Sequence, residues 1–356
     1  MFILVKNKIT GDYHTIYRKD KQDFLNLKSF FGTGEFNFDI IEDVNDIKKI
    51  LENKFASKGR GEEYDENIPS VTKIAYSLAP LNINSDKFLI RYWNNTPLKE
   101  QEGDKEFILA KGSWCHKILE LYVTDKENRS KDKPLIEKIK IIRNSKKPSK
   151  ELQKQIDNKI ISDIRRYIKI AYNDKEILSK IHNIDEVKEE LEFLAVKCLP
   201  EFIKNELIFT DCVYSEIFLR VDNSIQGSVD LCCYSNNKFS IWDFKTANSL
   251  DKKTGKPKFK SNSVSELAPY ARQLYSYDKL LKECKMSHIF STDLPEFSVV
   301  QIHLANGKYK KFDIPKGLVE AQGKLVEKVL KWYWNIRNGI KDIYNDELEE
   351  LEYITL

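Results

Sequence analysis

The fold of this chain is decided by residues 227–246, which read GSVDLCCYSNNKFSIWDFKT from Gly227 to Thr246. Two runs within it, 228–234 and 239–246, are rich in β-branched and aromatic residues and flank a Ser-Asn-Asn turn. Such runs predict two adjacent strands joined as a β-hairpin. We therefore expect this stretch to lie in a sheet and to bring side chains of its two strands together.

Two carboxylates and a lysine are the chemically notable side chains of this hairpin. Because side chains alternate along a strand, Asp243 and Lys245 are expected on one face and Trp242 and Phe244 on the other. Asp230, on the neighbouring strand, can then lie close to Asp243. Two carboxylates that close cannot both stay ionised unless a cation lies between them. Since Mg²⁺ prefers oxygen ligands that include one or two carboxylates, the pattern predicts a divalent-metal site beside Lys245.

A lysine beside such a site has several chemical uses. Lys245 could orient or deprotonate an attacking water, or stabilise the charge of a phosphodiester in its transition state. The simpler interpretation is that Asp230 and Asp243 are ordinary strand-end residues paired to lysines, because Asp-x-Lys triplets are common. The hairpin alone does not decide between the two.

Length and composition indicate a folded protein. At 356 residues and 41% hydrophobic residues, the chain can form one large domain or two ordinary ones. Its net charge of +4 is small, so affinity for nucleic acid would have to come from a local patch. Six cysteines without a Cys-x-x-Cys pair favour reduced thiols in an intracellular, cytoplasmic protein and argue against an iron–sulfur cluster. No signal peptide, transit peptide or membrane span is evident.

Turn and linker signals divide the chain into three parts. Residues 1–65 predict a small N-terminal α/β extension that ends in a polar, glycine-containing linker. Residues 66–340 predict an α/β core, interrupted by a basic helical insert at about 125–205. Residues 341–356 form an acidic C-terminal tail that we expect to be frayed. Within the core, periodicity predicts strands at 213–221, 297–304 and 309–314 and long helices at 265–284 and 317–338.

The helical insert is strongly basic. From residue 125 to about 169, Lys and Arg greatly outnumber Asp and Glu. Such a stretch is either a track for phosphates or a solvated helical face. Because no aromatic residues are interleaved for base stacking, the sequence gives the two interpretations equal weight.

Further candidate site residues lie on both sides of the hairpin in sequence. Glu216, on the preceding strand, is either a third carboxylate of the site or a surface partner of Arg220. Gln273 and Tyr277 lie four residues apart on one helix face, where an amide and a phenol could contact a phosphate. Tyr277 by itself would more often be a core residue.

One histidine lies before the hairpin, on a helix opened by Gly112. The imidazole of His116 can ligate a divalent ion. A lone helix histidine, however, is more often a packed residue.

In chain order these residues resemble a known set of motifs: Gly112-x-x-x-His116, Glu216, Gly227-x-x-Asp230, Asp243-Phe-Lys245-Thr246 and Gln273-x-x-x-Tyr277. The set is similar to that of the RecB-like branch of the PD-(D/E)XK nuclease superfamily. Pro69-Ser-Val-Thr-Lys, before the histidine helix, resembles the mitochondrial genome maintenance exonuclease group and its phage and bacterial relatives. The resemblance covers roughly residues 66–335.

This resemblance implies a restriction-endonuclease-like core, in which helices flank a mixed central β-sheet, and dependence on Mg²⁺ or Mn²⁺. The implied metal ligands are His116, Asp230, Asp243 and the backbone carbonyl of Phe244. The implied catalytic residues are Asp230, Asp243 and Lys245. The implied substrate-side residues are Gln273, Tyr277 and Thr246, with Glu216 and Ser70 as additional site residues. The second acidic position is Asp where Glu is common elsewhere in the superfamily.

The leading hypothesis is a metal-dependent DNA exonuclease that acts on single-stranded ends or flaps in replication, recombination or genome processing. Its expected partners are DNA and proteins of replication or recombination. The lysine- and asparagine-rich composition suits a phage, which would act in its host's cytoplasm, or another low-GC genome. One alternative is a structure-specific or duplex endonuclease on the same core. Another is a non-catalytic nucleic-acid-binding factor, which the joint presence of Asp230, Asp243 and Lys245 disfavours.

Overall fold

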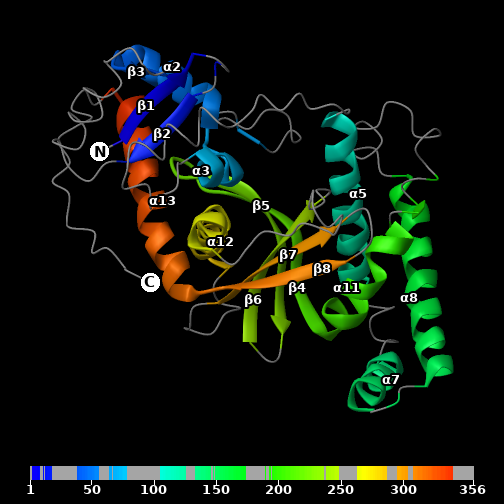
Figure 1. Cartoon of the computed structure of the whole chain (residues 1–356). Coiled ribbons are helices and arrows are strands. Elements are labelled where there is room, and N and C mark those ends of the chain that lie inside the picture. The colour runs from blue at the N-terminus through cyan, green and yellow to red at the C-terminus, as the bar shows by residue number, and fades with distance from the viewer. Residues whose placement is uncertain are drawn as a thin grey trace.

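In the computed structural model, helices surround a central β-sheet, and a second, smaller sheet lies near the N-terminus (Figure 1). The structure describes residues 2–8, 11, 13–17, 38–55, 64–77, 105–125, 133–173, 189, 192–247, 263–286, 295–303 and 308–339, with gaps at 66, 146, 148, 194 and 236–237. The expected acidic tail at 341–356 and most of the expected linker before residue 65 lie outside these residues.

The central sheet has five strands in chain order: β4 (Thr210–Arg220), β5 (Gln226–Ser235), β6 (Lys238–Ala247), β7 (Glu296–His303) and β8 (Tyr309–Ile314). β6 and β7 pair in parallel, and the other neighbours pair antiparallel. A parallel pair needs a crossover connection, and helix α12 (Val264–Glu283) lies between these two strands in the sequence. The hairpin expected at 227–246 is confirmed as β5 and β6.

Helices cover both faces of this sheet (Figure 1). One apolar cluster joins the sheet to α3 (Val71–Ser77), α12 and α13 (Lys316–Arg337). A second cluster joins it to α5 (Lys105–Thr124), α8 (Lys150–Ala171) and α11 (Pro200–Asn205). The expectation of a mixed central sheet flanked by helices is therefore confirmed. α7 (Lys133–Asn144) precedes α8, and a short 3-10 turn, η1 (Leu207–Phe209), leads into β4.

The side chains of β6 point alternately into the two apolar clusters. Ile241 belongs to the first cluster, whereas Trp242 and Phe244 belong to the second. The Phe202 ring of α11 lies 6.4 Å from the ring of Trp242 and 5.8 Å from that of Phe244. The predicted alternation is confirmed, and the apolar face of β6 holds the strand that carries Asp243.

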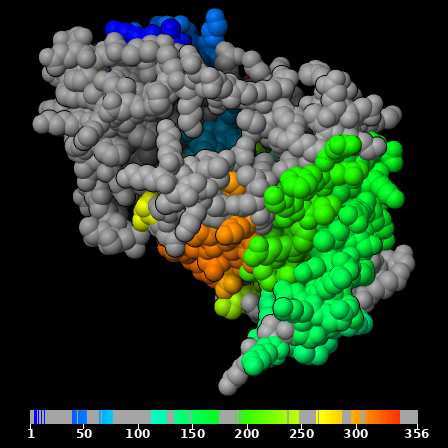
Figure 2. Space-filling view, turned by 45° about the vertical axis from the view of Figure 1, so that its right-hand side comes forward, coloured from blue at the N-terminus to red at the C-terminus, as the bar shows by residue number. Residues whose placement is uncertain are grey.

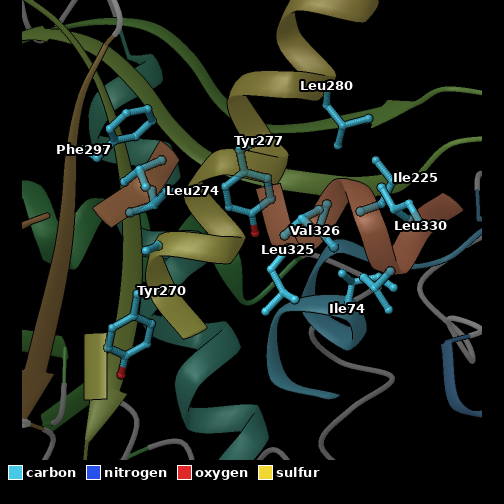
Figure 3. Packing of buried hydrophobic residues seen from close by; sticks show 14 of the residues in the cluster. Ile74, Ile225, Tyr270, Leu274, Tyr277, Leu280, Phe297, Leu325, Val326 and Leu330 are labelled. Atoms are coloured by element: carbon cyan, nitrogen blue, oxygen red, sulfur yellow. The ribbon is translucent and has the colours of Figure 1, made fainter. Parts of the chain in front are cut away.

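Helix α12 packs on the opposite face through an apolar stripe. Figure 3 shows Tyr270, Leu274 and Tyr277 on successive turns of this helix, and all three are buried. On the neighbouring α13, a Cβ atom at Gly323 would lie 2.2 Å from the Tyr275 ring. Only a glycine therefore lets α13 approach α12 at this point.

The N-terminal sheet is small and antiparallel, with the order β2 (Tyr13–Tyr17), β1 (Phe2–Asn7), β3 (Phe38–Ile41). Helix α2 (Val44–Phe55) follows, and Asp43 Oδ1 accepts hydrogen bonds from the backbone N–H groups of Asn45 and Asp46 at its start. Leu4, Ile47 and Leu51 join the same apolar cluster as α13. Among the helices that the structure describes, none has the length and apolarity needed to span a membrane.

Candidate metal and catalytic site

The candidate site lies where β5 and β6 separate. Their pairing runs from the turn as far as Leu231 and Trp242. Beyond that point β5 continues beside β4, and β6 continues beside β7. Asp230 and Asp243 are the next residues on the two strands. The backbone N–H of Phe244 donates to Asp230 Oδ2 at 2.6 Å, so this carboxylate satisfies a buried donor at the fork.

The buried Asp243 forms an ion pair with the half-buried Lys245 at the same fork. Lys245 Nζ lies 2.8 Å from Oδ1 and 2.7 Å from Oδ2 of Asp243, whose side chain is 1% exposed. Burial raises the pKa of Asp243 to about 6, Lys245 opposes this shift, and Asp230 adds to it. Burial lowers the pKa of Lys245, but Asp243 and Asp230 outweigh burial and raise it. Lys245 is therefore an ammonium at neutral pH, which favours orienting and charge-stabilising roles over that of a base.

A second group lies next to this pair and consists of His116, Glu216 and Asp230. One ligand atom from each lies within 4.8 Å of the other two. His116 Nδ1 is 3.3 Å from Glu216 Oε1 and 3.9 Å from Asp230 Oδ2. Burial lowers the pKa of His116, but Asp230 and Glu216 together raise it. Burial and Glu216 raise the pKa of Asp230, against the opposing effects of His116 and Lys245.

Strand β4 places Glu216 opposite Asp230. Ser215 pairs with Leu231 and Ile217 with Val229, which leaves Glu216 beside Asp230 in the register. The backbone of Glu216 has a φ of 49°, a left-handed conformation that costs a non-glycine residue about 1–3 kcal/mol. The sequence left open a pairing of Glu216 with Arg220, but the described contacts of Glu216 are with His116, and Arg220 Nε lies 3.5 Å from Asp222.

The site's donors fit a divalent cation. Burial raises the pKa of two carboxylates, Asp230 and Asp243, and the positive charge of Lys245 and His116 does not offset it. A dication would add positive charge. The group whose ligand atoms already converge contains Glu216 with His116 and Asp230. The sequence placed Asp243 in that set, and in the structure both oxygens of Asp243 contact Lys245.

Gln273 and Tyr277 lie together beneath the site. Gln273 Nε2 donates to the Tyr277 hydroxyl at 2.7 Å, and the two side chains are 2% and 3% exposed. Burial raises the pKa of Tyr277 well above its ordinary value, and Asp230 and Asp243 add to this shift. Within the described part of the chain, Gln273 Oε1 is buried and has no hydrogen-bond partner.

Two glycines of the sequence motifs permit close approaches around the site. A Cβ at Gly112 would lie 3.1 Å from Thr246 Oγ1, so the middle of α5 lies against the end of β6. The expectation that Gly112 opens this helix is wrong, because α5 already begins at Lys105. A Cβ at Gly227 would lie 2.9 Å from Val71 Cγ2 and 3.6 Å from the Tyr277 ring. Ser70, just before α3, is 8% exposed and forms a parallel bridge with Gln226 of β5. The two remaining candidate residues, Thr246 and Ser70, thus lie on the elements that frame the fork.

Two polar residues outside the sequence motifs, Gln226 and Arg272, hold α3 against the core. Gln226 Nε2 donates to Ile68 O at 2.8 Å, and its Oε1 accepts from the Asp65 N–H at 3.0 Å. Arg272 is fully buried, and it donates to Ala75 O at 2.8 Å and to Gln322 Oε1 at 3.0 Å. Burial lowers the pKa of Arg272 to about 10. Neither residue has a local sequence signal, because all these partners are distant in the chain.

Two tyrosines beside the site were not predicted from the sequence either. The rings of Tyr76 and Tyr270 lie 6.4 Å apart, edge to face, and Tyr76 is 44% exposed. Burial raises the pKa of Tyr270, and Lys245 and Asp243 also affect it, which places Tyr270 near the ion pair. The only available signal was the apolar periodicity of its helix, which indicates a core residue.

One known protein is similar to most of this chain in sequence. No protein-family model matches the sequence. The chain is 28% identical over 269 residues to the RecBCD enzyme subunit RecB of Borreliella burgdorferi, a match that covers 69% of this chain and 22% of RecB. The chain therefore matches about a fifth of the length of that relative.

Two solved structures are similar to part of this chain. One is a candidate exonuclease from Eubacterium rectale, with a TM-score of 0.31, 10% identity and coverage of 59% of this chain and 79% of that one. The other is the protein SSO0001, with a TM-score of 0.19, 14% identity and coverage of 55% and 81%. Both TM-scores are low. The similarity that bears on this chain is the one between its sequence and part of a RecB subunit.

Proposed function

We propose that this chain is a divalent-metal-dependent deoxyribonuclease that hydrolyses phosphodiester bonds at single-stranded DNA ends or flaps. The observation that carries the proposal is the Asp243–Lys245 pair beside the convergent group of His116, Glu216 and Asp230. Its similarity to part of a RecB subunit supports a nuclease. The preference for ends and a role in replication, recombination or genome processing come from the resemblance of the motifs.

The residues divide into a metal-binding group and a substrate-facing group. His116, Glu216 and Asp230 would hold the cation, with Asp243 adjacent. The cation would supply charge neutralisation at the phosphate oxygens and a lowered pKa for an attacking water. Lys245, an ammonium fixed by Asp243, would hold a phosphate oxygen or the water in place and stabilise the negative charge that develops. The Phe244 N–H keeps Asp230 oriented throughout.

Of the two expected cations, the donor set suits Mn²⁺ well. Imidazole is a common ligand of the later transition metals, whereas carboxylates suit Mg²⁺ and Mn²⁺ alike. One imidazole with two carboxylates is therefore a set that Mn²⁺ accepts more readily than Mg²⁺. We expect both ions to support cleavage, with Mn²⁺ effective at the lower concentration.

The test uses end-labelled single-stranded, duplex and flap DNA and a circular single strand, each incubated with Mg²⁺, Mn²⁺ or EDTA. The proposal expects metal-dependent shortening of single-stranded ends and no cleavage of the circle. Cleavage of the circle would show that the activity is that of an endonuclease on the same core and not of an exonuclease.

Variants connect the activity to the site. Asp243→Asn and Lys245→Ala should each lower cleavage roughly 100-fold or more while the protein stays folded. Asp222→Asn and Lys238→Ala remove the same charges from side chains that are 80% and 67% exposed, and should leave cleavage unchanged. Full activity in both site variants would rule out this site as the catalytic one. Absence of metal-dependent cleavage by the wild-type protein would favour a non-catalytic DNA-binding factor.

A further inference from the structure

The helices α7 and α8 concentrate positive charge on one part of the molecule. Residues 133–171 contain twelve Lys and Arg against four Asp and Glu, a net charge of +8, whereas the whole chain carries +4. Figure 2, in which the right-hand side of Figure 1 comes forward, shows these helices in teal and green as an exposed face. The positive charge of the chain is therefore local.

One face of α8 is a continuous polar stripe. Ile156, Ile160 and Ile164 face the apolar cluster that α8 shares with α5. The exposed positions on the other side recur every three or four residues, which places them in one row along the helix. This stripe consists of Lys154, Asn158, Ser162, Arg165 and Lys169.

The cations of the stripe are available to a partner. Two of the three acidic residues of α8 are already paired elsewhere, Asp157 with Lys204 at 2.7 Å and Asp163 with Lys159 at 2.6 Å. Among the described residues, no carboxylate lies within ion-pair distance of Lys154, Arg165 or Lys169. A solvated face built for stability would pair such charges along the helix, and this one does not.

The C-terminal end of α8 packs against the part of α5 that carries His116, and the stripe lies on the side of α8 that faces away from α5. Trp114 of α5 packs against Tyr172 at the end of α8, with ring centroids 4.8 Å apart, and Tyr122 packs against Tyr167 at 6.1 Å. The two helices therefore run antiparallel, and the end of α8 lies beside the turn of α5 that carries His116. From Lys169 to Lys154 the stripe extends about 22 Å along the helix axis, at about 1.5 Å per residue.

We propose that this stripe on α8 binds the sugar-phosphate backbone of double-stranded DNA and holds a duplex whose end or flap enters the site. The inference rests on the proposed function. It adds that the substrate contains a duplex region next to the strand that is cleaved. A span of about 22 Å matches about six base pairs at about 3.4 Å each. Surfaces that bind single strands use exposed aromatic rings for base stacking, and the described exposed residues of α7 and α8 include none.

The test compares two triple variants that remove the same charge. The stripe variant is Lys154→Ala with Arg165→Ala and Lys169→Ala. The control variant is Lys49→Ala with Lys324→Ala and Lys331→Ala, three exposed lysines on α2 and α13. Binding of a labelled duplex and of a single strand of equal length is measured by fluorescence anisotropy, in EDTA and over a range of NaCl concentrations. EDTA separates binding from cleavage.

The stripe variant should bind the duplex roughly tenfold or more weakly at low salt than the control variant does. Its plot of log affinity against log salt should have a slope smaller by about three, one for each lost phosphate contact. Its affinity for the single strand should equal that of the control variant.

Equal duplex binding by the two variants would overturn the inference, as would an equal loss of duplex and single-strand binding by the stripe variant. If the wild-type protein cleaves no DNA with Mg²⁺ or Mn²⁺ but shows the stripe-dependent duplex binding, the proposed nuclease fails and the binding surface stands.

Discussion

The Asp230 carboxylate accepts the backbone N–H of Phe244 at 2.6 Å, at the point where β5 and β6 stop pairing. Elsewhere in the sheet a carbonyl of the neighbouring strand accepts such an N–H, and at this point the Asp230 side chain takes its place. The contact fixes one carboxylate of the candidate metal group to the strand that carries Asp243 and Lys245. Substitutions of Asp230 can therefore remove its hydrogen bond to Phe244, which affects stability, or its charged carboxylate, which affects metal binding and activity. The two effects can be measured separately.

Asp230→Ala and Asp230→Asn should both lose activity but differ in stability. Alanine leaves the buried Phe244 N–H without an acceptor, which costs about 1–3 kcal/mol of unfolding free energy. Asparagine retains a carbonyl oxygen for that N–H and should lose clearly less. Urea denaturation of the metal-free proteins measures the difference. Equal stabilities of the two variants would show that the hydrogen bond contributes little.

The stability of metal-free protein should depend on pH through Asp243. Burial raises the pKa of this group from its ordinary 3.8 to about 6 in the folded protein. Between these values the folded protein holds a proton that the unfolded chain releases, so its stability falls as pH rises, by up to about 3 kcal/mol for a shift of about two units. Asp243→Asn carries no such proton.

The unfolding free energy of Asp243→Asn minus that of wild type should therefore rise between pH about 4 and about 6 and level off above. Any fixed cost of the substitution cancels, since only the change with pH is compared. Asp222→Asn, whose side chain is 80% exposed, controls for the lost carboxylate. A difference that is flat across this pH range would contradict the raised pKa.

Glu216→Gln should weaken metal binding without removing the fold. The carboxylate of Glu216 belongs to the convergent group with His116 and Asp230, and we expect at least a tenfold loss of Mn²⁺ affinity, since even groups behind the ligands cost about 10–100-fold. Isothermal titration calorimetry with Mn²⁺ alone measures it. If Glu216→Gln binds Mn²⁺ as tightly as wild type and Asp243→Asn binds it much more weakly, Asp243 is a metal ligand and Glu216 is not.

Gly227→Ala should destabilise the protein by about 1–3 kcal/mol, because a Cβ there would meet Val71 Cγ2 at 2.9 Å and force α3 away from β5. In a Val71→Ala background that atom is absent, and the same substitution should cost less. Gly317→Ala, at the start of α13 with open space around it, should be neutral or stabilising by up to about 1 kcal/mol. Denaturation of wild type, Gly227→Ala, Val71→Ala and the double variant measures the coupling between these two positions. Equal costs of Gly227→Ala in both backgrounds would argue against the contact.

Much of the fold follows from local pattern. The alternation around Trp242 and Phe244 and the stripe of α12 are periodic signals that only burial against a core can satisfy. The strands expected at 297–304 and 309–314 are β7 (Glu296–His303) and β8 (Tyr309–Ile314), within a residue at each end. The contact of Gln273 with Tyr277 also follows from their spacing on one helix.

The pairings between distant segments do not follow from such patterns. Glu216 could contact Arg220 two positions along its own face or a residue elsewhere, and it meets His116, which is 100 positions away. The parallel pairing of β6 with β7 depends on α12, which lies between these strands in the sequence. The hairpin pattern also does not show that the pairing of β5 with β6 ends at Leu231 and Trp242.

The sequence by itself determined which residues could carry chemistry: the hairpin with Asp230, Asp243 and Lys245, and the surplus of basic residues on α7 and α8. The tertiary structure decided which of them meet. It buried Asp243 beside Lys245, grouped Glu216 with His116 and Asp230, and turned the basic face of α8 outward, away from α5. The physical reason is that local periodicity fixes the direction of a side chain relative to its own element. Contacts between elements depend on packing across the whole core.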